Sequence, residues 1–162
     1  LVQRLEASDT FGLVSYSDDA TIDLAPARVG DRRAAHAAID RLVPGGGTHI
    51  EAALHEVSKI APVRRHPSDA LLVILLSDGI ANIGQTNPDA LAARARALFD
   101  ERGVLTTTLG VGTAFDEETM LAIAREGSGS YHFVRRSEDI AGILEDELEA
   151  RAEAVAQNLR LR

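Results

Sequence analysis

The chain contains no cysteine and no tryptophan, and aromatic residues make up only 4% of its 162 residues. Disulfides and thiolate metal sites are therefore excluded as sources of stability. Aliphatic side chains must fill the core, since 45% of the residues are hydrophobic. A chain of this length buries about two-thirds of the surface that its unfolded form exposes, which is enough for one self-supporting domain.

Positive charge is also scarce, because 17 basic residues face 25 acidic ones and the formal net charge is −8. An acidic surface repels phosphate backbones, so nucleic acid is excluded as the expected partner and cations are favoured. Long hydrophobic runs are missing as well, and nothing approaches the roughly 20 apolar residues of a membrane span. The chain begins at Leu1 rather than Met, and we expect it to be a fragment.

Hydrophobic patterning predicts five strands, at residues 11–17, 21–25, 70–76, 104–109 and 130–134. Residues 70–76 are apolar throughout, which is typical of a central parallel strand covered on both faces. Residues 21–25 follow a tight turn, so we expect an antiparallel edge strand there. The four other strands should share one sheet.

Helices are expected after each of the later strands, with start signals at Asn87-Pro88, Asp116 and Ser137. A helix from Asp31 should bury a stripe that includes Ile39 and Leu42. Residues 1–5 have the spacing of the end of a further helix. The alternation of helices and strands from Thr48 onward predicts an α/β fold, with a Rossmann-like, mostly parallel sheet and helices on both faces.

Asp78 follows the most apolar strand of the chain. In open α/β sheets, ligands bind beyond the carboxyl ends of the strands, so this residue is a candidate for a binding site. A carboxylate with low-dielectric neighbours needs a partner, which can be a basic side chain, helix-end amides or a cation. The alternative is that Asp78 only turns the chain together with Gly79.

Thr48 follows three glycines, Gly45 to Gly47, at the start of an expected helix. One interpretation is a capping box, in which the Thr48 hydroxyl accepts from a helix amide and Glu51 bonds back. The glycines favour a second interpretation, because they permit close backbone approach to a ligand. A phosphate-binding P-loop is excluded, since no lysine precedes Thr48.

Residues for catalysis do not assemble in any familiar pattern. His49 and His55 do not share a helix face and are expected on the surface. The Gly110-Val111-Gly112 turn lacks the third glycine of a dinucleotide site, because Phe115 takes that position. No nucleophile elbow and no HExxH motif occur. We therefore expect a binding module rather than an enzyme.

Several of these segments occur together and in order: residues 11–17, 44–48, 75–79, 108–112 and 127–131. In this arrangement the chain resembles a von Willebrand factor type A domain of the bacterial type. The resemblance covers nearly the whole sequence, and five ordered motifs are more specific than any one of them.

The resemblance implies a metal-ion-dependent adhesion site built from three loops. Thr48 matches the threonine of the glycine-rich loop, and Asp78 matches the aspartate after a later strand. The resemblance also implies a hard cation, Mg²⁺ or else Mn²⁺ or Ca²⁺, with one open position for an acidic side chain of a protein ligand. The third loop carries an Asp-x-Ser-x-Ser motif, which does not occur in this sequence.

We expect that motif upstream of Leu1 in the sequence. In the strand order that the resemblance implies, its strand lies in the sheet between the strands at residues 11–17 and 70–76. Metal binding by the fragment itself should therefore be weak. The domain should span residues 1–155, with residues 156–162 as a tail that starts a following element. Two alternatives to a metal-dependent binding module stay open. The first is a nucleotide-binding or phosphoryl-handling α/β enzyme domain, and the second is a structural domain without a working site.

Overall fold

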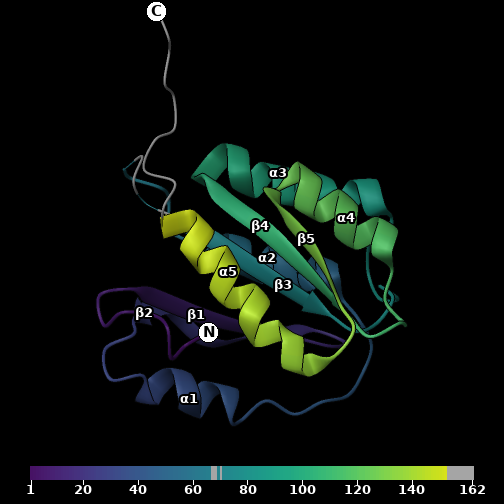
Figure 1. The fold of residues 1–162 in the computed structure, drawn as a ribbon. Coiled ribbons are helices and arrows are strands. Elements are labelled where there is room, and N and C mark those ends of the chain that lie inside the picture. Colours follow the sequence, from purple (N-terminus) through teal and green to yellow (C-terminus); the bar gives the residue numbers. More distant parts are fainter. Residues whose placement is uncertain (67–68, 70, 153–162) are drawn as a thin grey trace, which may run out of the picture.

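The computed structural model describes residues 1–66, 69 and 71–152. It confirms the predicted α/β fold, in which a parallel sheet has helices on both faces (Figure 1). The strands are β1 (Thr10–Tyr16), β2 (Ala20–Arg28), β3 (Leu71–Ser77), β4 (Val104–Val111) and β5 (Ser128–Val134). The helices are α1 (Arg33–Ile39), α2 (Ile50–Ile60), α3 (Pro88–Arg102), α4 (Glu117–Glu126) and α5 (Ile140–Ala152), with a 3₁₀ turn at Ser137–Asp139.

One expectation about the sheet was wrong: β1 does not join the parallel strands. β3, β4 and β5 form a three-stranded parallel sheet, while β1 and β2 form a separate antiparallel pair. β3 therefore lies at an edge of its own sheet, where we expected a central strand. No described strand lies between β1 and β3, and the two do not pair directly. The edge role of β2 is confirmed, since it pairs only with β1.

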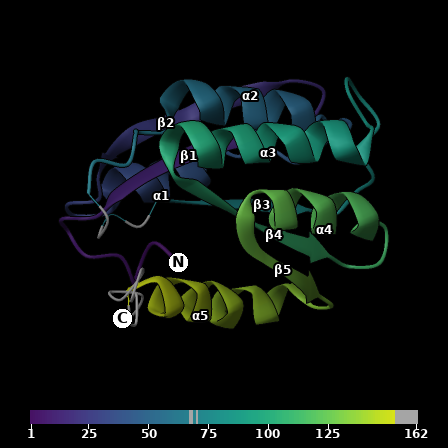
Figure 2. The same ribbon diagram turned by 90° about the horizontal axis from the view of Figure 1, so that it is seen from above.

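The uniform apolar character of β3 is explained by its two covered faces. Leu71, Val73 and Leu75 contact a core that includes buried residues of α2, α3 and α4. Ile74 points the other way and packs with Leu109 and with α5. Viewed from above, α5 lies alone on one side of the parallel sheet, with α2, α3 and α4 on the other (Figure 2). Alternate side chains of β3 therefore pack into two different cores, one on each face of the sheet.

The predicted start signals of α3 and α4 form in the structure, whereas Ser137 begins a 3₁₀ turn and α5 starts only at Ile140. The Asn87 side chain accepts from the Ala90 amide at 3.0 Å, and Pro88 occupies the first turn of α3. Asp116 accepts from the Thr119 amide and starts α4. Gly103 ends α3 with a positive φ of 71°, a conformation that glycine adopts without steric cost.

Two helix expectations near the amino terminus were wrong. Residues 1–9 form turns rather than a helix end, and the guanidinium of Arg32 donates to the carbonyls of Val2 and Leu5. These carbonyls are therefore satisfied from outside the segment. Helix α1 is shorter than expected and leaves Ile39 and Leu42 39% and 40% exposed.

No helix in the part of the chain that the structure describes is long and apolar enough to cross a membrane. The expected tail, residues 156–162, lies outside the described residues, as does the end of the expected domain at residue 155.

Candidate functional site

A cavity of about 380 Å³ opens where β1 and β3 end. Its walls come from the last residues of these two strands and from the glycine-rich loop before α2, with the lining residues Tyr16, Val43, Pro44, Gly45, Gly46, Gly47, Thr48, Leu76, Ser77 and Asp78. The structure therefore brings Thr48 and Asp78 to one cavity, although they are distant in sequence. This is the edge of an α/β sheet at which ligands bind.

Thr48 does not cap helix α2. The helix begins at Ile50, its N-cap is His49, and no side chain caps it. Glu51 does not bond back to the amide of Thr48, which donates instead to Asn82 Oδ1 at 2.8 Å. The capping-box interpretation therefore fails, and the Thr48 hydroxyl is left for another role.

The turn after β3 is shaped to fit against Thr48. A Cβ atom on Gly79 would lie only 2.8 Å from the Thr48 hydroxyl oxygen, so a larger residue would collide with it. Buried Ser77 braces the same turn, because its Oγ donates to the Gly79 carbonyl at 3.0 Å. Asp78 itself is exposed, and the expected low-dielectric surroundings of its carboxylate are not found.

The glycine-rich loop is held by its neighbours on both sides. The Gly47 amide donates to Asp18 Oδ1 at 2.6 Å, while the Asn82 amide donates to the Thr48 carbonyl at 3.1 Å. Gly46 has φ of 82°, and a Cβ on Gly47 would lie 2.5 Å from Ile83. Glycine is therefore required here for both backbone conformation and space.

Tyr16 links the two sheets at the base of the cavity. Its hydroxyl donates to the Leu76 carbonyl at 2.6 Å, so a side chain rather than a strand ladder spans the distance between β1 and β3. Burial raises the pKa of Tyr16 to about 12, and the negative charge of Asp78 acts in the same direction. The phenol thus stays protonated and keeps its role as donor.

The side-chain oxygens at the cavity are of the type that a hard cation binds, but there are too few of them to fill its coordination shell. The Thr48 hydroxyl and the Asp78 carboxylate are oxygen ligands of the type that Mg²⁺ and Ca²⁺ accept, but six or more ligands are needed. Among the described residues, no three acidic or histidine side chains converge to hold a metal. A complete shell needs oxygens beyond these two side chains.

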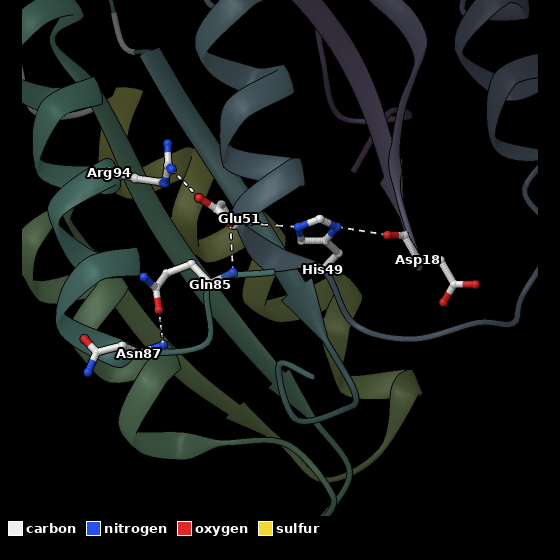
Figure 3. A network of polar contacts seen from close by, with 6 residues as sticks. All are labelled: Asp18, His49, Glu51, Gln85, Asn87 and Arg94. Atoms are coloured by element: carbon white, nitrogen blue, oxygen red, sulfur yellow. Dashed lines mark hydrogen bonds and ion pairs between the residues drawn. The ribbon is translucent and has the colours of Figure 1, made fainter. Parts of the chain in front are cut away.

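Sequence reasoning missed the residues that hold the loop in place. His49 was expected on the surface, yet its side chain is only 18% exposed and its Nδ1 lies 2.9 Å from the Asp18 carbonyl. Glu51 accepts from the Gln85 amide at 2.8 Å and pairs with Arg94 (Figure 3). The Gln85 amide, and after it Arg94, hold the pKa of Glu51 below its usual range. The sequence pointed to Glu51 only as a capping-box residue, and to His49 only through its place next to Thr48.

Comparison with known proteins agrees with this architecture. The model of the von Willebrand factor type A domain matches residues 1–146. An Escherichia coli K12 protein, described as uncharacterized protein YfbK, is 28% identical over 99% of this chain, which spans 28% of that relative's length.

Solved structures share the fold at low sequence identity. BatB from Bacteroides thetaiotaomicron is 19% identical with a TM-score of 0.75, covering 94% of this chain and 83% of its own. A von Willebrand factor type A protein from Catenulispora acidiphila is 23% identical with a TM-score of 0.74, and the match covers 98% of this chain and 36% of that protein's chain.

A third solved structure is proximal thread matrix protein 1 of the mussel byssus, described with a zinc-occupied MIDAS motif. It is 24% identical with a TM-score of 0.71, covering 93% of this chain and 38% of its own. Since the family model covers most of the sequence and the fold agrees, the chain belongs to the von Willebrand factor type A domain family.

Proposed function

We propose that the chain is the greater part of a metal-ion-dependent protein-binding module, in which Thr48 and Asp78 are metal ligands. The observation that carries this proposal is the shared cavity. Two loops, each held by its own contacts, present a hydroxyl and a carboxylate to the same space. Neither side chain is used in a hydrogen bond to another group in the described part of the chain, so both oxygens are free to bind a cation.

The cation we propose is Mg²⁺, with Mn²⁺ or Ca²⁺ as substitutes. Hydroxyl, carboxylate and water oxygens are the ligands that these ions prefer. The zinc-occupied motif of the mussel protein supports this choice only in showing that a related fold holds a divalent cation.

We further propose that the remaining ligands come from an Asp-x-Ser-x-Ser segment preceding Leu1, on a strand between β1 and β3. Both strands have a free edge toward each other among the described residues. Free edges at this place attract a further strand, because unpaired amides and carbonyls are costly. In this proposal the domain spans residues 1–155, and residues 156–162 lead into a following element.

The partner we propose is a protein that contributes an acidic side chain to the open metal position. A cation is needed for that contact, because the chain has a net charge of −8 and would otherwise repel a carboxylate. Nucleic acid is disfavoured for the same reason.

A binding role rather than a catalytic one is proposed because the cavity offers no activated nucleophile. Ser77 is its one serine, and the Ser77 hydroxyl is already bonded to the Gly79 carbonyl. Turnover of a nucleotide or an ester by the purified protein, abolished in Asp78→Ala, would overturn this part of the proposal.

Titration calorimetry with Mg²⁺ tests the metal site. A chain extended at its amino terminus should bind Mg²⁺ well, and the 162-residue chain should bind it poorly. In the extended chain, Thr48→Ala and Asp78→Asn should weaken binding, while Asp19→Asn on the exposed β1–β2 turn should not. Equal, tight binding by both chains would show that the preceding segment is not needed.

A further inference from the structure

The side chain of His49 lies between three segments that meet at the cavity. It follows Thr48 directly, and Figure 3 shows its ring between Asp18 of the β1–β2 turn and Glu51 of α2. The His49 amide donates to the Ser17 carbonyl at 2.9 Å, while the ring Nδ1 lies 2.9 Å from the Asp18 carbonyl. One residue thus bonds to two consecutive carbonyls of the same turn.

The ring also has no room to move toward the loop after β3. A Cβ atom on Gly84 would lie 2.1 Å from Nε2 and 2.7 Å from Cδ2 of His49, so the ring rests against the Gly84 backbone. Gly84 has φ of 66°, a conformation that favours glycine. The ring is therefore held by the β1–β2 turn on one edge and by this loop on the other.

Glu51 completes the arrangement from the first turn of α2, two residues after His49. Its Oε2 lies 3.9 Å from His49 Nε2 and accepts from the Gln85 amide at 2.8 Å, while its other oxygen pairs with Arg94 of α3. The first turn of α2 is thus attached to the loop after β3 and to α3. Thr48 immediately precedes this attached turn.

We infer that His49 is a positioning residue that sets the Thr48 hydroxyl relative to Asp78. The inference rests on the proposed metal site and adds the residue that orients one of its ligands. Because the acceptor at Nδ1 is a carbonyl, Nδ1 must carry a proton, and the ring donates to Asp18. Without this bond, two hydrogen bonds still link the loop to the β1–β2 turn, from the His49 amide to the Ser17 carbonyl and from the Gly47 amide to Asp18 Oδ1. The side chain of His49 would then no longer fix the position of Thr48.

Two substitutions at His49 separate the role of Nδ1 from ring bulk. Asparagine places an amide nitrogen near the position of Nδ1, whereas glutamine places one near that of Nε2. His49→Asn should therefore keep the bond to Asp18, and His49→Gln should lose it. His55→Gln, on the exposed face of the same helix, is the matched control.

The first readout needs no metal. Amide hydrogen exchange of Gly47 and Thr48, measured by NMR in the full-length protein, should be faster in His49→Gln and unchanged in His49→Asn and His55→Gln. In the wild type, ring ¹⁵N spectra should show a proton on Nδ1 of His49. A ring protonated only at Nε2, or unchanged exchange in His49→Gln, would overturn the inference.

The second readout is Mg²⁺ affinity, measured by calorimetry in the same proteins. His49→Gln should bind about 10- to 100-fold more weakly, the range found when a residue that orients a metal ligand is lost. His49→Asn keeps the bond to Asp18 and should bind Mg²⁺ as tightly as the wild type, a rescue that the loss of the ring alone would not allow. If the wild type bound neither Mg²⁺ nor Mn²⁺, the proposed function would fail while the exchange data still decided the role of His49.

Discussion

The two sheets of this domain are held together in different ways. In the parallel sheet, β3 and β4 pair in an unbroken register from Leu71 to Ser77, and β4 and β5 pair with one register shift, between Thr106 and Thr108. Three consecutive threonines of β4, Thr106 to Thr108, are fully buried. The β1–β2 hairpin has two register shifts, and none of its residues is fully buried.

Tyr16 of the hairpin packs against the core that includes Leu75, and the hydrogen bonds that link the hairpin to its neighbours lie near the ends of the strands. Tyr16 reaches the Leu76 carbonyl, and the glycine-rich loop bonds to Asp18 of the hairpin turn. The candidate site therefore lies where the more deeply buried parallel sheet meets a less buried hairpin. Stability comes mainly from the first, while the geometry of the site depends on polar links to the second.

The largest expected effect is in the core on the α3–α4 side of the parallel sheet. Ile123 of α4 is completely buried, so Ile123→Ala should lower the free energy of unfolding by about 2–5 kcal/mol through lost packing and a cavity. Leu121 lies on the same helix but is 51% exposed, and Leu121→Ala should change stability by less than about 1 kcal/mol. Urea denaturation measures both, and equal losses would contradict the description of this core.

A smaller loss is expected on the opposite face, beneath α5. Glu147 of α5 is 6% exposed and accepts from the Thr107 hydroxyl at 2.9 Å, with His132 Nε2 at 2.8 Å. Glu147→Ala leaves these two groups without the carboxylate and should cost about 1–3 kcal/mol. Amide exchange along α5 should rise, whereas exposed Glu149→Ala should leave it unchanged. Equal exchange in the two variants would show that Glu147 does not hold the helix.

Alkaline pH should loosen the contact between the sheets. The pKa of Tyr16 is about 12 in the fold and about 10 in an unfolded chain. Its stabilising contribution is therefore complete below pH 10 and is lost as the pH rises toward 12, because only the unfolded state releases the proton in that range.

Tyr16→Phe is the variant that tests this assignment. It should cost about 1 kcal/mol at neutral pH through the lost bond to Leu76, and it should flatten the decline above pH 10. Tyr131 is the one other tyrosine, and burial also raises its pKa, so part of the decline should persist. Urea denaturation from pH 8 to 12 measures the effect, and identical profiles for both proteins would rule out Tyr16 as its source.

The smallest effects on stability are expected at the proposed metal ligands. Thr48→Ala and Asp78→Asn should each change the free energy of unfolding by less than about 0.5 kcal/mol, since neither side chain makes an internal hydrogen bond among the described residues. Asn82→Ala removes the acceptor of the Thr48 amide and should cost about 1 kcal/mol. Equal losses in all three variants would mean that Thr48 and Asp78 support the fold rather than a ligand.

The sequence by itself determined the local features of this protein. Caps at Asn87 and Asp116 and the break at Gly103 form as predicted, because each depends on one side chain or one backbone conformation within a few residues. The apolar run of β3 correctly indicated a strand with two covered faces. Loop position made Thr48 and Asp78 two separate candidates, and only the resemblance to a known family joined them as a pair.

Only the tertiary structure decided how the sheets relate and what holds the site. The split between β1 and β3 depends on which distant segments pair, whereas the alternation within a strand shows only which residues face the same side of the sheet. The turns at residues 1–9 are bound by Arg32, and the His49 ring is held by the Asp18 carbonyl. These hydrogen bonds connect residues about 30 positions apart, and whether such groups meet depends on the folding of everything between them.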